Sequence, residues 1–350
     1  MKNLFSPLLW ILASFVVLIV PLETLSAQTF KTNNVFIYGV VEGTTGLITV
    51  MLPNGRVGTD GQLNFYAHSY FSCNINNQVF TNNDVAGKPA NAGVGWQLND
   101  GQSNKTGDTI FTVWVRSGVQ ITQEVFPIAF SRSGQIMIRW RFANPTASTV
   151  KVACQYLNDI AIVDPHDPSL PNADDGPILF YPNSYRDAWQ RIPSAAMLEM
   201  PPFYVGFLRD LPNANPGISA LGNLDNPSLG TIKPSQITIG DWTIMANTSF
   251  GHPTPDWLIG TALGSDNAIL IEFPFQSIAS KSTALVGATT YGTSELEMCN
   301  NAVFALANYP HTLIWNSTAN KYPVTTIPLD LYIINLNPWP VTGTVDITTG

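Results

Sequence analysis

Apolar and polar residues alternate with a period of two along much of this chain. Over residues 136–142 one face carries large apolar side chains and the other a methionine and two arginines: Ile136, Ile138, Trp140 and Phe142 against Met137, Arg139 and Arg141. After a turn at 144–148, residues Val150, Val152, Cys154 and Tyr156 resume the apolar face. This alternation is typical of strands with one buried side, so the two segments predict an antiparallel β-hairpin.

Further strands are predicted at 35–41, 47–51, 110–116, 119–125, 236–245, 268–273 and 284–291. Turn-forming Gly, Asn, Asp and Pro residues separate them, and the chain has no alternating strand–helix rhythm, glycine-rich phosphate loop or heptad repeat. The one helix expected is a short one at 194–199. Many short strands at this spacing predict an all-β protein, a large antiparallel β-sandwich of the supersandwich kind.

Three segments differ from this pattern. Residues 1–27 combine Lys2, an apolar run at 8–20 and the small-residue site Leu25-Ser26-Ala27, as in a secretory signal peptide. The run is shorter than the roughly 20 apolar residues of a spanning helix, so a secreted or cell-surface protein without a membrane span is expected after cleavage.

Residues 159–234 are irregular and rich in Pro and Asn, which is consistent with a ligand-facing excursion or with a cover over a sheet edge.

The C-terminal part predicts a second, incomplete β unit. A strand at 329–334, Asn337-Pro338, and a strand at 345–347 repeat the strand–turn–strand layout around Asn144-Pro145. The predicted organisation is a signal peptide over 1–27, a large sandwich over 28–300, and a linker with the start of an immunoglobulin-like unit over 301–350. The alternative is that the last strands complete the first sheet.

The composition limits the partners. Hydrophobic residues make up 45% of the chain and charged residues 11%, against about 25% charged in typical domains, so the surface must be largely uncharged. A net charge of −8 with 16 Lys and Arg gives no electrostatic basis for binding nucleic acid or anionic lipid. The three cysteines allow at most one internal disulfide. Cys154 is expected to pack as a small apolar residue, and Cys73–Cys299 is one candidate bridge whose geometry the sequence leaves open.

Two polar groups of residues are candidates for chemistry. The carboxylates Asp164, Asp167, Asp174 and Asp175 could hold calcium, the only cofactor considered, although they match no EF-hand spacing and could instead cap their own turns. His252 lies close in sequence to Asp256, and such a pair could act as acid and base near neutral pH. The alternative is a loop histidine bonded to backbone. No HExxH or GxSxG motif is present.

Aromatic and basic residues are candidates for ligand binding. Trp189, Tyr185 and Trp257 fall in or near the irregular stretch, where their rings could stack on sugars or fill the core. Arg139 and Arg141 could line a groove for an acidic ligand or form a solvated outer face.

From about residue 34 to 299 the chain resembles the large β-sandwich domains of the galactose-mutarotase-like, carbohydrate-binding superfamily, and more narrowly domains of exported bacterial proteins. The pieces that carry the resemblance are Pro53-Asn54-Gly55, Asp60-Gly61-Gln62-Leu63, Ile138-Arg139-Trp140-Arg141-Phe142-Ala143-Asn144, Tyr156-Leu157-Asn158-Asp159, Ser265-Asp266-Asn267-Ala268-Ile269 and Thr290-Tyr291-Gly292. The resemblance implies carbohydrate binding. The superfamily's catalytic histidine–carboxylate pair has no match here residue by residue.

These observations favour an exported, non-catalytic module with a structural, adhesive or glycan-binding role. Its partners would be glycans or other surface proteins, with self-association as a further option. Two alternatives remain: a secreted carbohydrate-active enzyme, epimerase-like or glycoside-cleaving, and a subunit of an extracellular filament or surface layer.

Overall fold

The computed structural model describes residues 28–33, 37–51, 63–64, 69–82, 96–130, 133–159, 161–162, 175–180, 184–186, 190–193, 203–208, 219–245, 258–261, 267–294, 297–300, 303–308 and 330–335.

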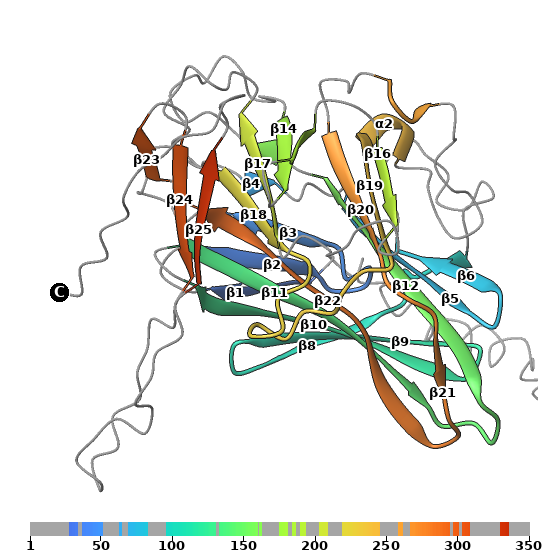
Figure 1. The fold of residues 1–350 in the computed structure, drawn as a ribbon. Coiled ribbons are helices and arrows are strands. Elements are labelled where there is room, and N and C mark those ends of the chain that lie inside the picture. Colours follow the sequence, from blue (N-terminus) through green and yellow to red (C-terminus); the bar gives the residue numbers. More distant parts are fainter. Residues whose placement is uncertain are drawn as a thin grey trace, which may run out of the picture.

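Two large antiparallel sheets dominate the fold (Figure 1). The larger has nine strands, in spatial order β15 (Ser184–Arg186), β14 (Asp175–Phe180), β17 (Phe203–Leu208), β18 (Ser219–Asn223), β22 (Ser282–Ser294), β11 (Ser133–Asn144), β10 (Val119–Phe130), β9 (Thr109–Arg116) and β8 (Gln102–Thr106). We call it the nine-stranded sheet. The second follows the order β16 (Gln190–Pro193), β19 (Gln236–Asp241), β20 (Asn267–Glu272), β12 (Val150–Asp159), β5 (Tyr70–Ile75), β6 (Gln78–Thr81) and β7 (Trp96–Gln97), with β21 (Gln276–Ile278) also paired to β12. We call it the eight-stranded sheet, and its β6–β7 pair is parallel.

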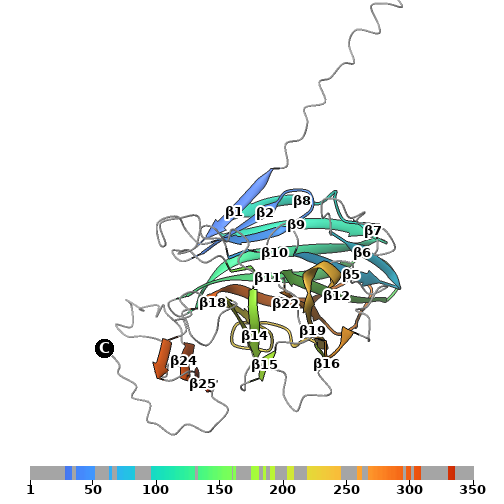
Figure 2. The ribbon, with the colours of Figure 1, turned by 90° about the horizontal axis from the view of Figure 1, so that it is seen from above.

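Three small sheets complete the described part. They are β1 (Thr29–Asn33), β2 (Tyr38–Glu42) and β3 (Ile48–Met51); β4 (Leu63–Asn64) and β13 (Ala161–Ile162); and β23 (Glu297–Asn300), β24 (Val303–Asn308) and β25 (Asp330–Asn335). The sheet of β1 to β3 packs on the nine-stranded sheet, since Gly39 faces Ile136 of β11. In Figures 1 and 2 the sheet of β24 and β25 lies to one side of the sandwich. The fold class predicted from the sequence is confirmed.

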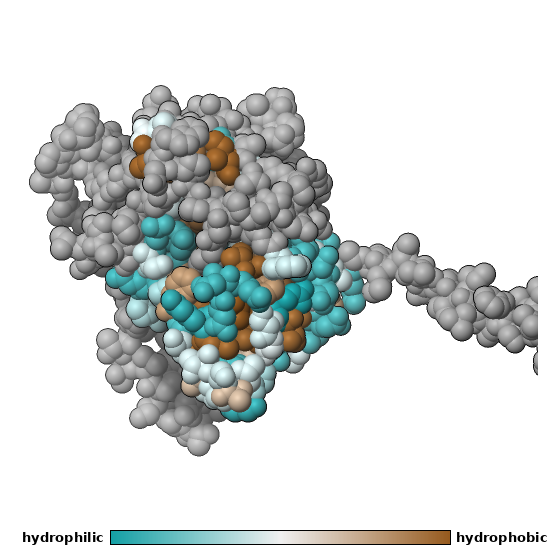
Figure 3. Space-filling model, turned by 90° about the vertical axis from the view of Figure 1, so that its right-hand side faces the viewer, coloured by the Kyte–Doolittle hydropathy of each residue, from teal (hydrophilic) through white to brown (hydrophobic). Residues whose placement is uncertain are grey.

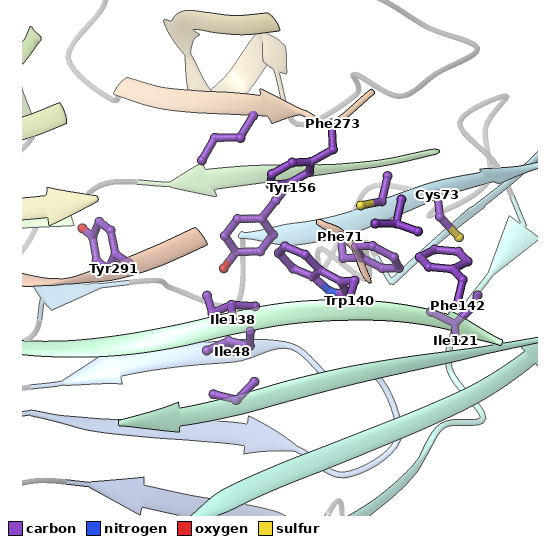
Figure 4. Close-up of a cluster of buried hydrophobic side chains, with 14 of the residues drawn as sticks. Ile48, Phe71, Cys73, Ile121, Ile138, Trp140, Phe142, Tyr156, Phe273 and Tyr291 are labelled. Atoms are coloured by element: carbon purple, nitrogen blue, oxygen red, sulfur yellow. The ribbon is translucent and has the colours of Figure 1, made fainter. Parts of the chain in front are cut away.

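Aromatic rings fill the space between the two large sheets (Figure 4). Phe71 of β5 stacks on Trp140 of β11 with ring centroids 5.1 Å apart, and on Trp114 of β9 at 6.3 Å. Trp140 also contacts Tyr156 and Phe273 from the opposite sheet. All five side chains are at most 2% exposed. The alternating apolar residues of the sequence therefore form the interface between the layers.

Gln123 is a polar residue inside this aromatic core, and both ends of its side chain are bonded. The Trp140 indole Nε1 donates to its Oε1 at 3.0 Å, and its Nε2 donates to the Gly46 carbonyl at 2.7 Å. Gly46 has a φ of +70° and lies so close to Trp114 that a Cβ there would be 2.6 Å from the ring. The turn between β2 and β3 thus reaches into the core because glycine leaves room for the tryptophan.

The predicted hairpin of 136–142 and 150–156 is wrong. Both segments are strands, but β11 pairs with β10 and β22, whereas β12 pairs with β5, β20 and β21. The turn after Asn144 carries the chain from one sheet to the other, so the two apolar faces meet across the sandwich, with Trp140 against Tyr156. Alternation shows which side of a strand is buried but does not identify its neighbour in the sheet.

Other predicted elements have mixed outcomes. The strand expected over 236–245 ends at Asp241, and α2 (Trp242–Met245) follows as a single helical turn. The strand at 329–334 is found as β25, which pairs with β24. The helix at 194–199, the strand at 345–347 and the leader at 1–27 lie outside the described residues. Among the described residues, no helix is long and apolar enough to span a membrane.

Cys73 and Cys154 are both buried free thiols. The candidate Cys73–Cys299 bridge is therefore not present. Cys154 packs in the core as a small apolar residue, as predicted.

Candidate functional site

A group of polar side chains lies inside the sandwich at the end of β12, where the aromatic core stops. It consists of Tyr156, Asn158 and Asp159 from β12, Tyr204 from β17, and Ser69 next to β5. Their exposed fractions are between 0% and 4%. We call these five residues the β12 polar cluster. Strand alternation places Asn158 on the same inward face as Tyr156, which packs in the core.

Hydrogen bonds link β12 to β17 and to Ser69, the residue that precedes β5. The Asn158 Nδ2 donates to the Tyr204 hydroxyl, and the Asp159 backbone N–H donates to the Ser69 Oγ at 2.9 Å. The Asn158 Oδ1 is buried and has no hydrogen-bond partner among the described residues. A buried acceptor without a donor is destabilising by about 1–3 kcal/mol, so a donor that reached this atom would stabilise the cluster.

Burial keeps the two tyrosine hydroxyls neutral. It raises the pKa of Tyr156 well above its ordinary value, and the nearby Tyr204 and Asp159 raise that pKa further. Burial also raises the pKa of Tyr204, against the opposing effect of the hydrogen bond from Asn158. At neutral pH the cluster therefore offers hydroxyls that both donate and accept, together with an amide.

Glycine makes room for the Tyr204 ring. Tyr204 is directly opposite Gly222 of β18, and Gly222 is opposite Tyr291 of β22. A Cβ at Gly222 would lie 2.2 Å from the Tyr204 ring, so the ring lies over the bare backbone of β18. Tyr291 is 1% exposed and belongs to the same core, as Figure 4 shows. The tyrosines of β17 and β22 thus share one inward row, separated by the glycine.

Most of the predicted site residues lie outside the described part of the chain. These are His252, Asp256, Trp189, Trp257, Asp164, Asp167 and Asp174. Asp175 begins β14 and Tyr185 lies in β15. The calcium site, the acid–base pair and the aromatic ligand-binding residues stay predictions. Within the described ranges, no three His, Cys, Asp or Glu residues form a group that could hold a metal ion.

Arg139 and Arg141 occupy the outer face of the nine-stranded sheet, as the alternation predicted. The Arg141 Nε donates to the Glu124 Oε1 at 2.5 Å, and this pair is partly exposed. The Arg139 guanidinium lies over the Phe126 ring at 5.0 Å, while its Nε is buried without a hydrogen-bond partner. Arg141 is thus neutralised by Glu124, whereas Arg139 is held by an aromatic ring.

The described surface is mixed rather than strongly charged or apolar. Figure 3 views the molecule from the right-hand side of Figure 1. On this face, apolar side chains lie between hydrophilic ones. β8 exposes Gln102, Asn104 and Thr106 together with one charged side chain, Lys105.

Sequence reasoning missed the β12 polar cluster as a site. Tyr156-Leu157-Asn158-Asp159 carries part of the resemblance, and Tyr204 lies within the irregular stretch at 159–234. The one available signal was a strand whose apolar alternation ends in Asn and Asp. Nothing in the sequence places Tyr204 or Ser69 beside them, because Tyr204 lies in β17 and Ser69 directly precedes β5.

Comparisons with known proteins find similar solved structures only. No family model matches the chain, and no curated protein matches its sequence. A galactose mutarotase-related enzyme from Lactobacillus acidophilus has 8% identity and a TM-score of 0.41, with 77% of this chain and 98% of that chain covered. A galactose mutarotase-like protein from Lactobacillus casei has 6% identity and a TM-score of 0.40, covering 76% and 100%. An α-galactosidase from Lactobacillus brevis has 11% identity and a TM-score of 0.38, covering 76% and 39%.

Proposed function

We propose that this protein is an exported, secreted or cell-surface β-sandwich module that binds carbohydrate without transforming it, with the β12 polar cluster as part of the site. The observation that carries the proposal is the buried Asn158 Oδ1, which has no donor among the described residues and lies within a group of neutral hydroxyls. A sugar hydroxyl supplies such a donor.

The chemistry of the cluster suits a neutral polyol better than an ion. Tyr156, Tyr204 and Ser69 contribute hydroxyls that donate and accept, and the Asn158 amide does both through its two ends. Asp159 adds one carboxylate acceptor. Because the pKa of both tyrosines is raised, their hydroxyls stay protonated near neutral pH and neither is available to abstract a proton. This favours binding over acid–base catalysis.

Titration calorimetry of the purified chain with neutral mono- and oligosaccharides tests the proposal, after a glycan array has selected the probes. Asn158→Leu removes the unsatisfied acceptor at similar volume. We expect binding at least tenfold weaker, equivalent to about 1.4 kcal/mol. We expect the free energy of unfolding to change by only about 1 kcal/mol, because the variant removes an orphaned polar atom as well as one hydrogen bond.

Tyr70→Phe is the matched control. Tyr70 is also 1% exposed, and its hydroxyl donates to the Met245 carbonyl in a separate apolar group of residues. The control should lose a buried hydrogen bond and keep its ligand affinity. The proposal would be refuted if no glycan on the panel binds, or if the Asn158→Leu variant binds as tightly as the unmodified chain.

An enzymatic alternative rests on Asp159, a carboxylate that is 4% exposed and close enough to Tyr156 to raise its pKa. Polarimetry with freshly dissolved α-anomers and assays with chromogenic glycosides test it. Turnover that Asp159→Asn abolishes, with binding retained, would replace the binding function with a catalytic one.

A further inference from the structure

Cys73 of β5 and Cys154 of β12 face each other inside the sandwich. The two residues are direct partners in the antiparallel register of these strands, and both are fully buried. Both belong to the core between the sheets, where Figure 4 shows Cys73 among Phe71, Trp140 and Phe142. Their side chains therefore project to the same side of the eight-stranded sheet.

The backbone hydrogen bonds show that this is a closely spaced pair. The Cys154 carbonyl accepts from the Phe273 N–H at 2.9 Å, on the side of β12 away from β5. The Phe71 carbonyl accepts from the Asn82 N–H at 3.1 Å, on the side of β5 away from β12, and Cys73 points the same way because residues two apart share a direction. Cys73 and Cys154 thus form a non-hydrogen-bonded pair, whose Cα atoms lie about 4.5 Å apart in such ladders. Disulfides span Cα separations of about 4.4–6.8 Å.

The surroundings leave room for the sulfurs and shield them from solvent. A Cβ at Gly287 of β22 would lie 2.6 Å from the Cys154 Sγ, so only glycine is accommodated beside this thiol. Burial raises the pKa of both thiols, and the neighbouring Cys73 raises that of Cys154 further. In the closed sandwich both cysteines are therefore protonated and slow to react, since the thiolate is the reactive form.

We propose that Cys73 and Cys154 form an intramolecular disulfide when the chain folds in an oxidising compartment, before the sheets close over them. The oxidant is a small-molecule or protein disulfide. One cysteine gives its proton to solvent, and its thiolate attacks a sulfur of that disulfide, forming a mixed disulfide and releasing one thiolate. The second cysteine, likewise deprotonated, attacks the protein-bound sulfur and releases the other thiolate. The cysteine pair loses two electrons and two protons, and the oxidant becomes two thiols.

Oxidative refolding followed by peptide mapping tests the bond. The chain is unfolded in reductant, refolded with glutathione disulfide, alkylated in denaturant, digested, and analysed by mass spectrometry without reduction. We expect a mass about 2 Da below that of the reduced chain before alkylation. We also expect a cross-linked pair of peptides containing Cys73 and Cys154, with Cys299 alkylated. The folded, reduced chain exposed to the same oxidant should form the link at least about tenfold more slowly, because its thiols are buried.

Cys299→Ala is the control and should form the same link. Alkylation of both Cys73 and Cys154 after oxidative refolding, or a cross-link from either of them to Cys299, would overturn the proposal. Because the decisive measurement uses the unmodified chain, it does not depend on whether variants at Cys73 or Cys154 fold.

Discussion

Two regions of the sandwich interior are equally buried and chemically different. Around Phe71 and Trp140, rings from both layers pack with centroids about 5–6 Å apart, and the polar side chain of Gln123 is bonded at both ends. At the end of β12 the interior holds tyrosine hydroxyls, an amide and a carboxylate, and Asn158 is bonded at one end only.

The difference shows that burial alone does not distinguish a core from a site. In the aromatic region both ends of the Gln123 side chain are bonded within the chain, while the buried Trp114 Nε1 has no partner among the described residues. In the β12 polar cluster the atom without a partner among the described residues is an acceptor, the Asn158 Oδ1. An interior that is packed but not satisfied is where a ligand can add stability.

The aromatic region should dominate stability. Trp140→Ala removes a fully buried indole and leaves the Gln123 Oε1 without its donor, so unfolding should become easier by about 3–5 kcal/mol. Denaturant titration followed by circular dichroism measures this. Val115→Ala, at a position 60% exposed in β9, should change stability by less than about 0.5 kcal/mol. Equal losses in both variants would show that the aromatic rings are not the main support.

The buried tyrosines of the β12 polar cluster should make the free energy of unfolding fall at alkaline pH. Burial holds the pKa of Tyr156 and Tyr204 above the unfolded value of about 10. The folded state therefore keeps protons that the unfolded state loses, and the associated stability is intact below pH 10. It falls as pH rises above that, by up to about 1.4 kcal/mol per pH unit for each tyrosine.

Urea titrations between pH 8 and pH 11 measure the slope, and phenolate absorbance reports ionisation. The double variant Tyr156→Phe, Tyr204→Phe should flatten the slope. Ionisation of these tyrosines near pH 10 in the folded state would contradict the closed site.

The two hydrogen bonds of the buried Gln123 side chain should contribute measurably to stability. Gln123→Ala leaves the Gly46 carbonyl and the Trp140 indole N–H unpaired in the core, which should cost about 1–3 kcal/mol. Gln120→Ala on the same strand is the matched control, because Gln120 is exposed and bonds only Thr122 within the described structure. Thermal unfolding should separate the two variants clearly. A Gln120→Ala loss as large as that of Gln123→Ala would show that position in the strand, rather than buried bonding, matters.

The smallest effect is expected outside the sandwich. Arg141 is 41% exposed, so its ion pair with Glu124 is screened by water. Arg141→Ala should lower stability by about 0.2–1 kcal/mol, and the loss should shrink in high salt. Unfolding in 0.05 M and 1 M sodium chloride checks this. A loss that is large and independent of salt would mean that the stem of Arg141, rather than its charge, supports the sheet.

The sequence predicted much of the fold and little of the candidate site. Alternation identified the inward faces of β11 and β12, the strands around Ile110, Val119 and Ala268, and the outward position of Arg139. It failed at the turn after Asn144, where the next strand enters the opposite sheet, and at Asp241, where a helical turn replaces the end of a strand. The local alternation of apolar and polar residues shows which side of a strand is buried, but it does not show which strand lies next to it.

The amino-acid sequence by itself determined that this chain folds as layered, antiparallel β-sheets with a largely uncharged exterior, because side-chain direction in a strand follows a strict period of two. Only the tertiary structure decided that Tyr204 meets Asn158, that Cys73 faces Cys154, and that β11 and β12 lie in opposite layers. The first two contacts join residues far apart in the sequence, and the third depends on which sheet each strand enters, so none of them follows from the local pattern of side chains.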